Sequence, residues 1–274
     1  MEEFLKSLLF LNIQASVLII TLLLLKRFII KSYSGFWQRL LWILAILFMI
    51  IPVWKAVPVN SFEPILMPFD NMLSIENENI FQDEFPDDDE LKTLENQGFT
   101  NNNTNVSFVK ITVLMWVLGV MVFLLLSFGS YFIYLLKMKR NSFGIEENEA
   151  FESAKAKLNI KRRVRIRKVS VSQSPLLTGC FFPIVYMPDG MININEEELI
   201  YLHELTHFKH KDLPIKWVVC VINAINWFNP LMYIAIKNLN EACEIYCDET
   251  VTKKMNDEQK RMYMNTILNL VVRK

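Results

Sequence analysis

His203-Glu204-Leu205-Thr206-His207 contains two of the three histidines in this chain of 274 residues. In a helix, positions i and i+4 lie on one face with Cβ atoms roughly 5–6 Å apart, so both imidazoles can reach one metal ion at about 2.0–2.1 Å. Glu204 lies beside them, where a carboxylate can take a proton from a metal-bound water. The stretch therefore predicts a zinc site, with His203 and His207 as metal ligands and Glu204 as the catalytic base.

The residues around this motif favour a helix. Asn195 is a good helix cap, and Glu198 stands three residues later, as in a capping box. Leu199, Leu202 and Leu205 then form an apolar stripe with helical spacing. The competing interpretation is a chance match of a loose pattern on a buried helix, so the prediction needs further ligands elsewhere in the chain.

The composition differs from that of an ordinary soluble enzyme. The 29 basic and 29 acidic residues balance, which gives no sign of direct nucleic-acid binding. However, 52% of the residues are hydrophobic and the mean hydropathy is positive. These values predict a protein that contacts the lipid bilayer.

Three apolar segments are long enough to cross a bilayer of about 30 Å, which takes about 20 helical residues. We expect two transmembrane helices joined by a basic cytoplasmic loop within residues 1–57, and a third helix at 108–136. Residues 58–107 are rich in Asn and acidic residues, a composition typical of a solvated loop. Residues 137–274 are then expected to form one further domain.

Basic residues predict the orientation of these segments. Those that follow the first span are Lys26, Arg27, Lys31 and Arg39, and those that follow the third are Lys137, Lys139 and Arg140. The positive-inside rule places both groups in the cytoplasm. The N-terminus and the acidic loop 58–107 are then extracytoplasmic, and the domain 137–274 is cytoplasmic.

The cytoplasmic domain is expected to combine helices with a small sheet. An amphipathic helix is predicted at 146–158, and a half-exposed strand within the basic run 161–168, where apolar residues alternate with charges. A nucleic-acid patch is the alternative for this run, but we favour a strand close to lipid headgroups. Residues 174–179 predict a loop and 181–187 a second strand, with Pro183 at an edge or bulge. An edge strand beside a metal helix can hold an extended peptide.

A catalytic zinc ion needs a third protein ligand and one position left for water. His210 lies on nearly the same helix face, but one turn of helix rarely supplies three ligands to a tetrahedral ion. Glu241, Glu244 and Asp248 are better donors, because the spacing i, i+3, i+7 presents them on one side of a helix. One can bind zinc while another accepts a hydrogen bond from a ligating imidazole, and a solvated acidic face is the alternative.

The four cysteines contain no Cys-x-x-Cys pair and are expected to be reduced thiols on the cytoplasmic side. They are Cys180, Cys220, Cys243 and Cys247. The last two are spaced i, i+4 near the predicted site. They remain alternative ligands, although small packing residues are the simpler interpretation.

Several motifs together resemble a known family. The pair His203-Glu-Leu-Thr-His207 and Glu244-Ile-Tyr-Cys-Asp248 is similar to the motifs of gluzincin proteases. Nearly the whole chain resembles the BlaR/MecR family of bacterial membrane zinc metallopeptidases, which signal the presence of β-lactams. The other matching features are the upstream spans, Ser174-Pro175…Gly179…Pro183-Ile184-Val185…Pro188, Asp212, and Trp227-Phe228-Asn229-Pro230-Leu231. The resemblance implies Glu244 as the third metal ligand and Asp248 as a carboxylate that supports a ligating imidazole.

Residues 213–236 are apolar enough to form a fourth span. If they crossed the membrane, Glu244 would lie on the opposite side from His203 and the two could not share an ion. The residues Asn223, Asn226 and Asn229 also suit a buried or re-entrant hairpin better than a lipid-facing helix. We therefore expect a membrane-associated hairpin that belongs to the protease domain.

Together these features predict a mainly α protein with a small β-sheet, of the α+β class. Polytopic membrane helices would carry a gluzincin-like cytoplasmic metalloprotease domain in the bacterial plasma membrane. The resemblance implies one catalytic Zn²⁺ and a protein or peptide substrate, with self-cleavage and direct or indirect inactivation of a transcriptional repressor. A homodimer is also compatible with these features. The alternatives are a quality-control protease of the HtpX or CAAX-prenyl-protease type and a non-catalytic signalling scaffold that contains zinc.

Overall fold

The computed structural model describes residues 2–28, 33–50, 102–145, 148–169, 174–189 and 194–272. The helices in these ranges are α1 (Glu2–Phe28), α2 (Gly35–Leu47), α4 (Asn102–Arg140), α5 (Glu149–Lys157), α6 (Ile194–Lys209), α7 (Asp212–Ile225), α8 (Pro230–Thr252) and α9 (Asp257–Val272). The strands are β1 (Ser142–Gly144), β2 (Arg165–Val169), β3 (Leu176–Thr178) and β4 (Ile184–Pro188). The predicted mainly helical α+β class is confirmed.

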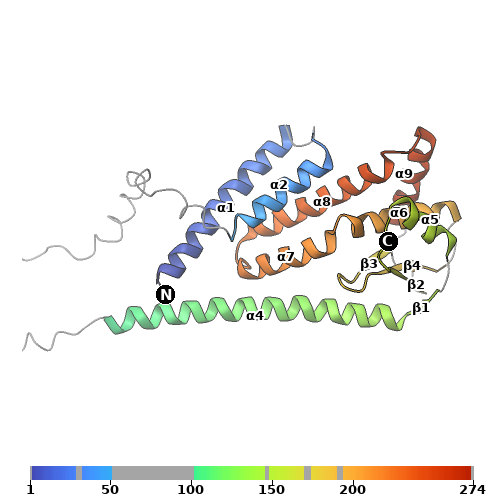
Figure 1. Cartoon of the computed structure of the whole chain (residues 1–274). Helices are drawn as coiled ribbons and strands as arrows, with labels where there is room; N and C mark the ends of the chain where they lie inside the picture. Colours follow the sequence, from blue (N-terminus) through green and yellow to red (C-terminus); the bar gives the residue numbers. More distant parts are fainter. Residues whose placement is uncertain are drawn as a thin grey trace, which may run out of the picture.

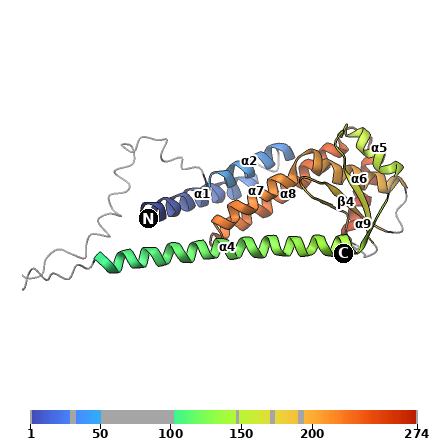
Figure 2. The ribbon, with the colours of Figure 1, turned by 60° about the horizontal axis from the view of Figure 1, so that its bottom comes forward.

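The molecule is elongated and has two parts, which are joined by helix α8 (Figure 1). The sheet, α5, α6, α9 and the end of α8 form a head. Helices α1, α2, α7 and the first part of α8 form a stalk, and α4 runs beside it toward the head. The second view shows the same arrangement (Figure 2). Because α8 belongs to both parts, the stalk and the head are joined through one continuous helix.

The head is built on a four-stranded mixed sheet in the order β1-β2-β4-β3. Strands β2 and β4 are parallel, and the two outer pairs are antiparallel. Apolar side chains of α5 and α6 pack with inward residues of the sheet, and Phe151, Val185, Tyr201 and Leu205 are buried there. Helix α5 is capped by Asn148, whose side chain accepts a hydrogen bond from the Phe151 amide at 2.9 Å. This core fixes one face of α6.

Two predictions about the sheet were wrong. The expected loop 174–179 contains β3, a strand of three residues that is too short to show an alternating pattern. The strand expected at 181–187 is β4, and it lies inside the sheet because β3 pairs with its outer side. The edge strand beside α6 is therefore β3. Pro183 precedes β4 and contributes its carbonyl, which accepts from the Arg165 amide at 3.0 Å.

The stalk has its own apolar core between α1, α2, α7 and α8. Its fully buried side chains include Ile19, Trp42, Ile222 and Met232. Helix α2 lies along α8, and a Cβ atom at Gly35 would be 2.5 Å from the Tyr246 backbone nitrogen. Only glycine permits this close approach between the two helices.

Two described helices, α1 and α4, are long and apolar enough to cross a membrane, at Lys6–Lys26 and Phe108–Arg140. Helix α2 is a shorter apolar helix of 13 residues, and residues 51–101 lie outside the described ranges. The predicted span from residue 40 to 57 and most of the loop 58–107 therefore stay predictions. Arg39, assigned above to the loop after the first span, lies within α2.

The apolar segment 213–236 forms α7 and the first turns of α8, joined by a short turn at residues 226–229. Asn229 caps α8 by accepting from the Leu231 amide at 3.0 Å, and its amide nitrogen donates to Asn12 of α1 at 3.0 Å. Helix α4 contacts this hairpin, since Trp116 donates its indole N–H to the Ile225 carbonyl at 3.1 Å. Both arms of the hairpin thus pack against other helices.

Candidate metal centre

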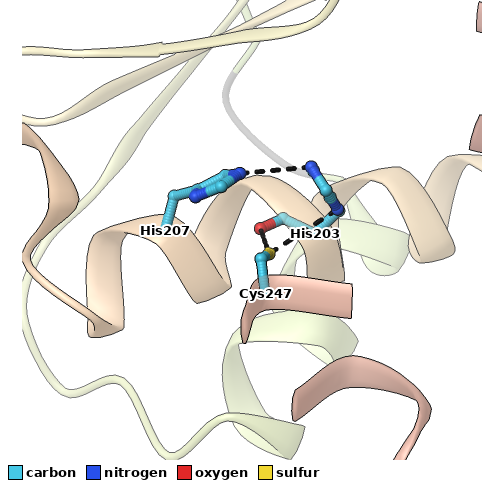
Figure 3. Close-up of side chains that lie close together, drawn as sticks. All are labelled: His203, His207 and Cys247. Atoms are coloured by element: carbon cyan, nitrogen blue, oxygen red, sulfur yellow. Dashed lines mark hydrogen bonds between the residues drawn. The ribbon is translucent and has the colours of Figure 1, made fainter. Parts of the chain in front are cut away.

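Helix α6 presents both histidines of the motif on one face (Figure 3). Their Nε2 atoms are 3.2 Å apart, and the rings meet edge to face. The helix begins at Ile194, so Asn195 lies within its first turn. Glu198 contacts Ser153 and Lys157 of α5 at 2.5 and 2.6 Å, so it ties α6 to α5.

Glu244 of α8 faces the two imidazoles. Its Oε2 atom is 3.4 Å from Nε2 of His203 and 3.4 Å from Nε2 of His207. Ligands placed about 2.0–2.1 Å from a tetrahedral zinc ion are separated from each other by about 3.3–3.4 Å. The three atoms therefore form a triangle of the size that zinc requires, and one imidazole pair with one carboxylate is a donor set that zinc accepts.

The outward nitrogen of His207 is held by a chain of charged groups. Its Nδ1 atom donates to Oδ2 of Asp212 at 2.7 Å, and Oδ1 of Asp212 forms an ion pair with Arg39 of α2 at 2.7 Å. Arg39 also donates to the His210 carbonyl at 2.6 Å. Lys211 adopts a left-handed conformation, with φ of 59°, which turns the chain so that Asp212 comes back over His207. This arrangement leaves Nε2 of His207 free for a metal.

The outward nitrogen of His203 is held in a similar way. Its Nδ1 atom is 2.7 Å from the Tyr263 hydroxyl, which donates to Oδ1 of Asp248 at 2.6 Å. Asp248 itself is 3.3 Å from Nδ1. Because the hydroxyl proton goes to Asp248, the tyrosine oxygen accepts from Nδ1–H. Nε2 of His203 is then also free.

The electrostatic environment of the centre favours positive charge. Burial lowers the pKa of His207, but the Asp212 hydrogen bond and nearby Cys247 and Glu244 outweigh it and raise that pKa to about 12. The pKa of His203 is also raised, since its contacts with Asp248, Cys247 and Glu244 outweigh burial. The pKa of Glu244 is lowered by both imidazoles despite burial. A cation between these side chains would satisfy the same charges, so the residues fit a zinc ion.

Glu204 lies in the same cavity, whose volume is about 530 Å³. The cavity is lined by β3 together with residues of α6, α7, α8 and α9. Burial raises the pKa of Glu204, and the Leu177 amide of β3 donates a hydrogen bond to its carboxylate. The edge strand therefore contacts the carboxylate of the motif directly.

Cys247 is the alternative third donor, since its thiol and one nitrogen of each imidazole lie within 4.8 Å of one another. The thiol is 3.3 Å from the His203 carbonyl and 3.6 Å from its Nδ1 atom (Figure 3). That nitrogen already contacts Tyr263. Glu244 instead lies equally close to both free Nε2 atoms, so its position suits a shared ion better.

The other residues considered as metal ligands make different contacts. His210 stacks on Tyr246 at 3.9 Å, and burial lowers its pKa to about 4. Glu241 forms an ion pair with Lys26 of α1 at 2.7 Å. All four cysteines are free thiols.

Sequence reasoning missed Tyr263 and the role of Arg39, because neither lies near the motif in the sequence. Asp212 was noted only as part of a family pattern.

A small mixed sheet, a helix with His-Glu-x-x-His, and an acidic residue from a second helix are together the arrangement of a metallopeptidase domain. The family described as BlaR1 peptidase M56 matches residues 6–274, and the chain belongs to it. The resemblance stated above is confirmed.

Named relatives agree with this assignment. The regulatory protein BlaR1 of Bacillus licheniformis is 30% identical over 159 residues, which cover 56% of this chain and 26% of the relative. The methicillin resistance MecR1 proteins of Staphylococcus aureus and Staphylococcus epidermidis are 26% identical across 98% of this chain and 47% of their own length. The chain thus spans less than half the length of these relatives.

Proposed function

We propose that this protein is a zinc-dependent endopeptidase of the bacterial plasma membrane that acts in signal transduction. The observation that carries the proposal is the triangle formed by the Nε2 atoms of His203 and His207 and Oε2 of Glu244, with sides of 3.2 to 3.4 Å. These three residues would hold one Zn²⁺. When bound, the ion would polarise a peptide carbonyl and make water acidic enough to react near neutral pH.

The other residues of the cavity have separate tasks in this proposal. Glu204 takes the proton from the attacking water and passes it to the departing amine, so it acts first as a base and then as an acid. Asp212 keeps Nδ1 of His207 protonated, and Tyr263 with Asp248 does the same for His203. A zinc site with a purely structural role has no use for Glu204 in this position, which argues against the non-catalytic scaffold.

The substrate would be an extended segment of a protein. Strand β3 has one paired side, toward β4, and lines the metal cavity with Leu176 and Leu177. An extended peptide can add to such an edge through backbone hydrogen bonds. We propose that regulated cleavage includes the chain itself and leads, directly or indirectly, to inactivation of a transcriptional repressor.

Substitution of Glu204 tests the proposal. Purified Glu204→Gln should bind zinc at the wild-type stoichiometry and lose proteolysis by about 10²–10⁴-fold, because it lacks the base and keeps the ligands. Glu196→Gln, in the first turn of the same helix, is the matched control and should retain activity. Activity of Glu204→Gln at the wild-type level would refute the assigned chemistry.

A further inference from the structure

A second and larger cavity, of about 1350 Å³, lies between α4 and the head. One wall is formed by α4 from Phe128 to Lys139, and the other by the β3–β4 loop and the start of α7. Its volume exceeds the roughly 300–1,000 Å³ of most small-molecule pockets. Leu213 lines both this groove and the metal cavity, so the two are neighbours.

The lining of the groove combines apolar surface with positive charge. Its cations are Lys139, Lys161, Arg162, Lys209 and Lys211. No acidic residue lines it among the described residues, and none of its cations forms an ion pair with a described acidic side chain. Arg162 is anchored by donating to the Phe181 carbonyl at 2.6 Å. The groove therefore suits an anion attached to an apolar body.

Aromatic side chains occupy the wall and the rim. Trp217 of α7 stacks on Phe128 at 4.9 Å and meets Tyr131 edge to face at 4.9 Å, which holds α4 against α7. Phe181 and Phe182 are 81% and 72% exposed at the rim. Gly179, with φ of +81°, shapes the turn that presents them, and a Cβ there would be 2.3 Å from the Phe182 carbonyl oxygen. Two adjacent exposed phenylalanines present apolar surface to solvent, which is typical of a site that contacts a membrane or another protein.

The groove lies at the height of a membrane surface if α4 crosses the bilayer. About 20 helical residues cross the hydrocarbon core, so a span that begins near Lys110 leaves it near Ser130. The groove begins at Phe128, and the basic residues Lys137, Lys139 and Arg140 close the helix. Tyr and Trp are enriched at this boundary. Phe132 and Leu136 are exposed on the same helix, so the groove is continuous with its lipid-facing surface.

We propose that this groove binds an anionic phospholipid of the cytoplasmic leaflet. The phosphate lies among Lys161, Lys209 and Lys211, and an acyl chain lies along α4 and the exposed phenylalanines. The bound lipid would hold the head against the membrane beside the metal cavity. This inference rests on α4 crossing the membrane, as expected from its apolar length, and does not depend on zinc or on proteolysis.

A lipid-binding measurement on the purified full chain in neutral detergent tests the proposal. The probes are fluorescent phosphatidylglycerol and phosphatidylcholine with the same label and chains, and wild type should prefer the anionic lipid. The variant Lys161→Gln/Lys209→Gln/Lys211→Gln should weaken phosphatidylglycerol binding by about fivefold per lysine, or roughly 100-fold, and leave the weaker phosphatidylcholine binding unchanged. It retains Arg162 and its carbonyl contact.

The matched control removes the same charge from exposed lysines of α8 and the turn that follows it. Lys237→Gln/Lys253→Gln/Lys254→Gln should bind phosphatidylglycerol as wild type does. Phe181→Ser/Phe182→Ser should weaken binding of both lipids, because it removes apolar contacts. Equal loss in both lysine variants would overturn the proposal, as would displacement of the probe by inorganic phosphate alone. Lipid-independent dimers that Phe181→Ser/Phe182→Ser separates would instead identify a second copy of the chain as the occupant.

Discussion

Each imidazole of the proposed zinc site donates from Nδ1 and leaves Nε2 free, but the two rings rely on different partners. His207 donates to a buried carboxylate, and His203 donates to a tyrosine hydroxyl. Since neither partner is part of the motif, the ligating geometry depends on α2, α7 and α9 as well as α6. Two predictions at the level of single residues follow from these contacts.

The first concerns the identity of the third ligand. Glu244→Gln should lower zinc affinity by more than the about 10–100-fold that loss of a ligand's hydrogen-bond partner costs, because it removes a ligand itself. Cys247→Ser should bind zinc nearly as wild type does. Glu241→Gln is the control, since Glu241 pairs with Lys26 outside the site. Competition with a chromophoric chelator measures the three affinities. A large loss in Cys247→Ser, with none in Glu244→Gln, would reassign the ligand.

The second concerns Arg39 as a positioning residue for His207. Arg39→Gln should lower zinc affinity by about 10–100-fold, because Asp212 loses the partner that orients it. The same change also breaks a buried ion pair and leaves Asp212 with the His207 contact alone, so stability should fall by up to about 3–5 kcal/mol.

A double substitution separates the two effects. Arg39→Gln/Asp212→Asn removes both buried charges, so it should recover stability while zinc affinity stays low. Lys26→Gln is the control, because that lysine contacts α8 away from the metal cavity. Recovery of zinc affinity together with stability would show that the Arg39–Asp212 pair supports only the fold.

At the level of elements, the contact between α2 and α8 links the stalk to the proposed site. The Gly35 amide at the start of α2 donates to the Glu249 carboxylate at 2.8 Å, a favourable position for an anion at a helix N-terminus. Phe36 packs edge to face on Tyr246 of α8, and Arg39 lies over the same ring. Helix α8 carries Glu244, so the first two helices are packed on an element of the metal site.

Gly35→Ala tests this contact. Its Cβ would meet the Tyr246 backbone at 2.5 Å, so the helices must separate, and the loss of stability should be about 1–3 kcal/mol. Gly129→Ala on α4 is the matched control, because no described atom beyond its chain neighbours and its own helix backbone lies within 4 Å of the added Cβ. Thermal unfolding in detergent measures both. Equal unfolding midpoints for the two variants would mean that α2 and α8 can separate without loss of stability.

At the level of the whole molecule, the proposed metal site limits how the hairpin of α7 and α8 can be placed in a membrane. His203 of α6 and Glu244 of α8 lie on either side of this hairpin and 3.4 Å apart, so both must face the same compartment. A fourth crossing would separate them. The packing of α7 against α4 and of α8 against α2 agrees with a hairpin that is held by protein contacts.

Accessibility labelling in intact cells tests this topology. In a cysteine-free background, single cysteines at Asn141→Cys and Lys254→Cys should both resist a membrane-impermeant maleimide added outside, and both should react after permeabilisation. The positions lie after α4 and after α8, respectively. Labelling of the second position alone in intact cells would make 213–236 a true crossing and exclude the proposed triangle.

The local features of this protein could be predicted from its sequence, because the spacing of residues along the chain determines them. The i, i+4 histidines share a helix face wherever the helix forms, and the apolar lengths of α1 and α4 are properties of each segment alone. The mainly helical α+β class also follows from such patterns. Helical spacing made Glu244 one of three candidate ligands, the family resemblance selected it, and its distances to the histidines came only from the fold.

Other features required the tertiary structure, because they depend on contacts between distant segments. Arg39 has the same side chain whether it lies in a basic loop or beside Asp212, and it contacts His210 across 171 positions. A three-residue strand such as β3 has no period of its own and exists only because β4 pairs with it. Tyr263 becomes part of the metal centre only when α9 packs on α6. Side-chain type sets which partners a residue can accept, and only the folded chain brings one of them within reach.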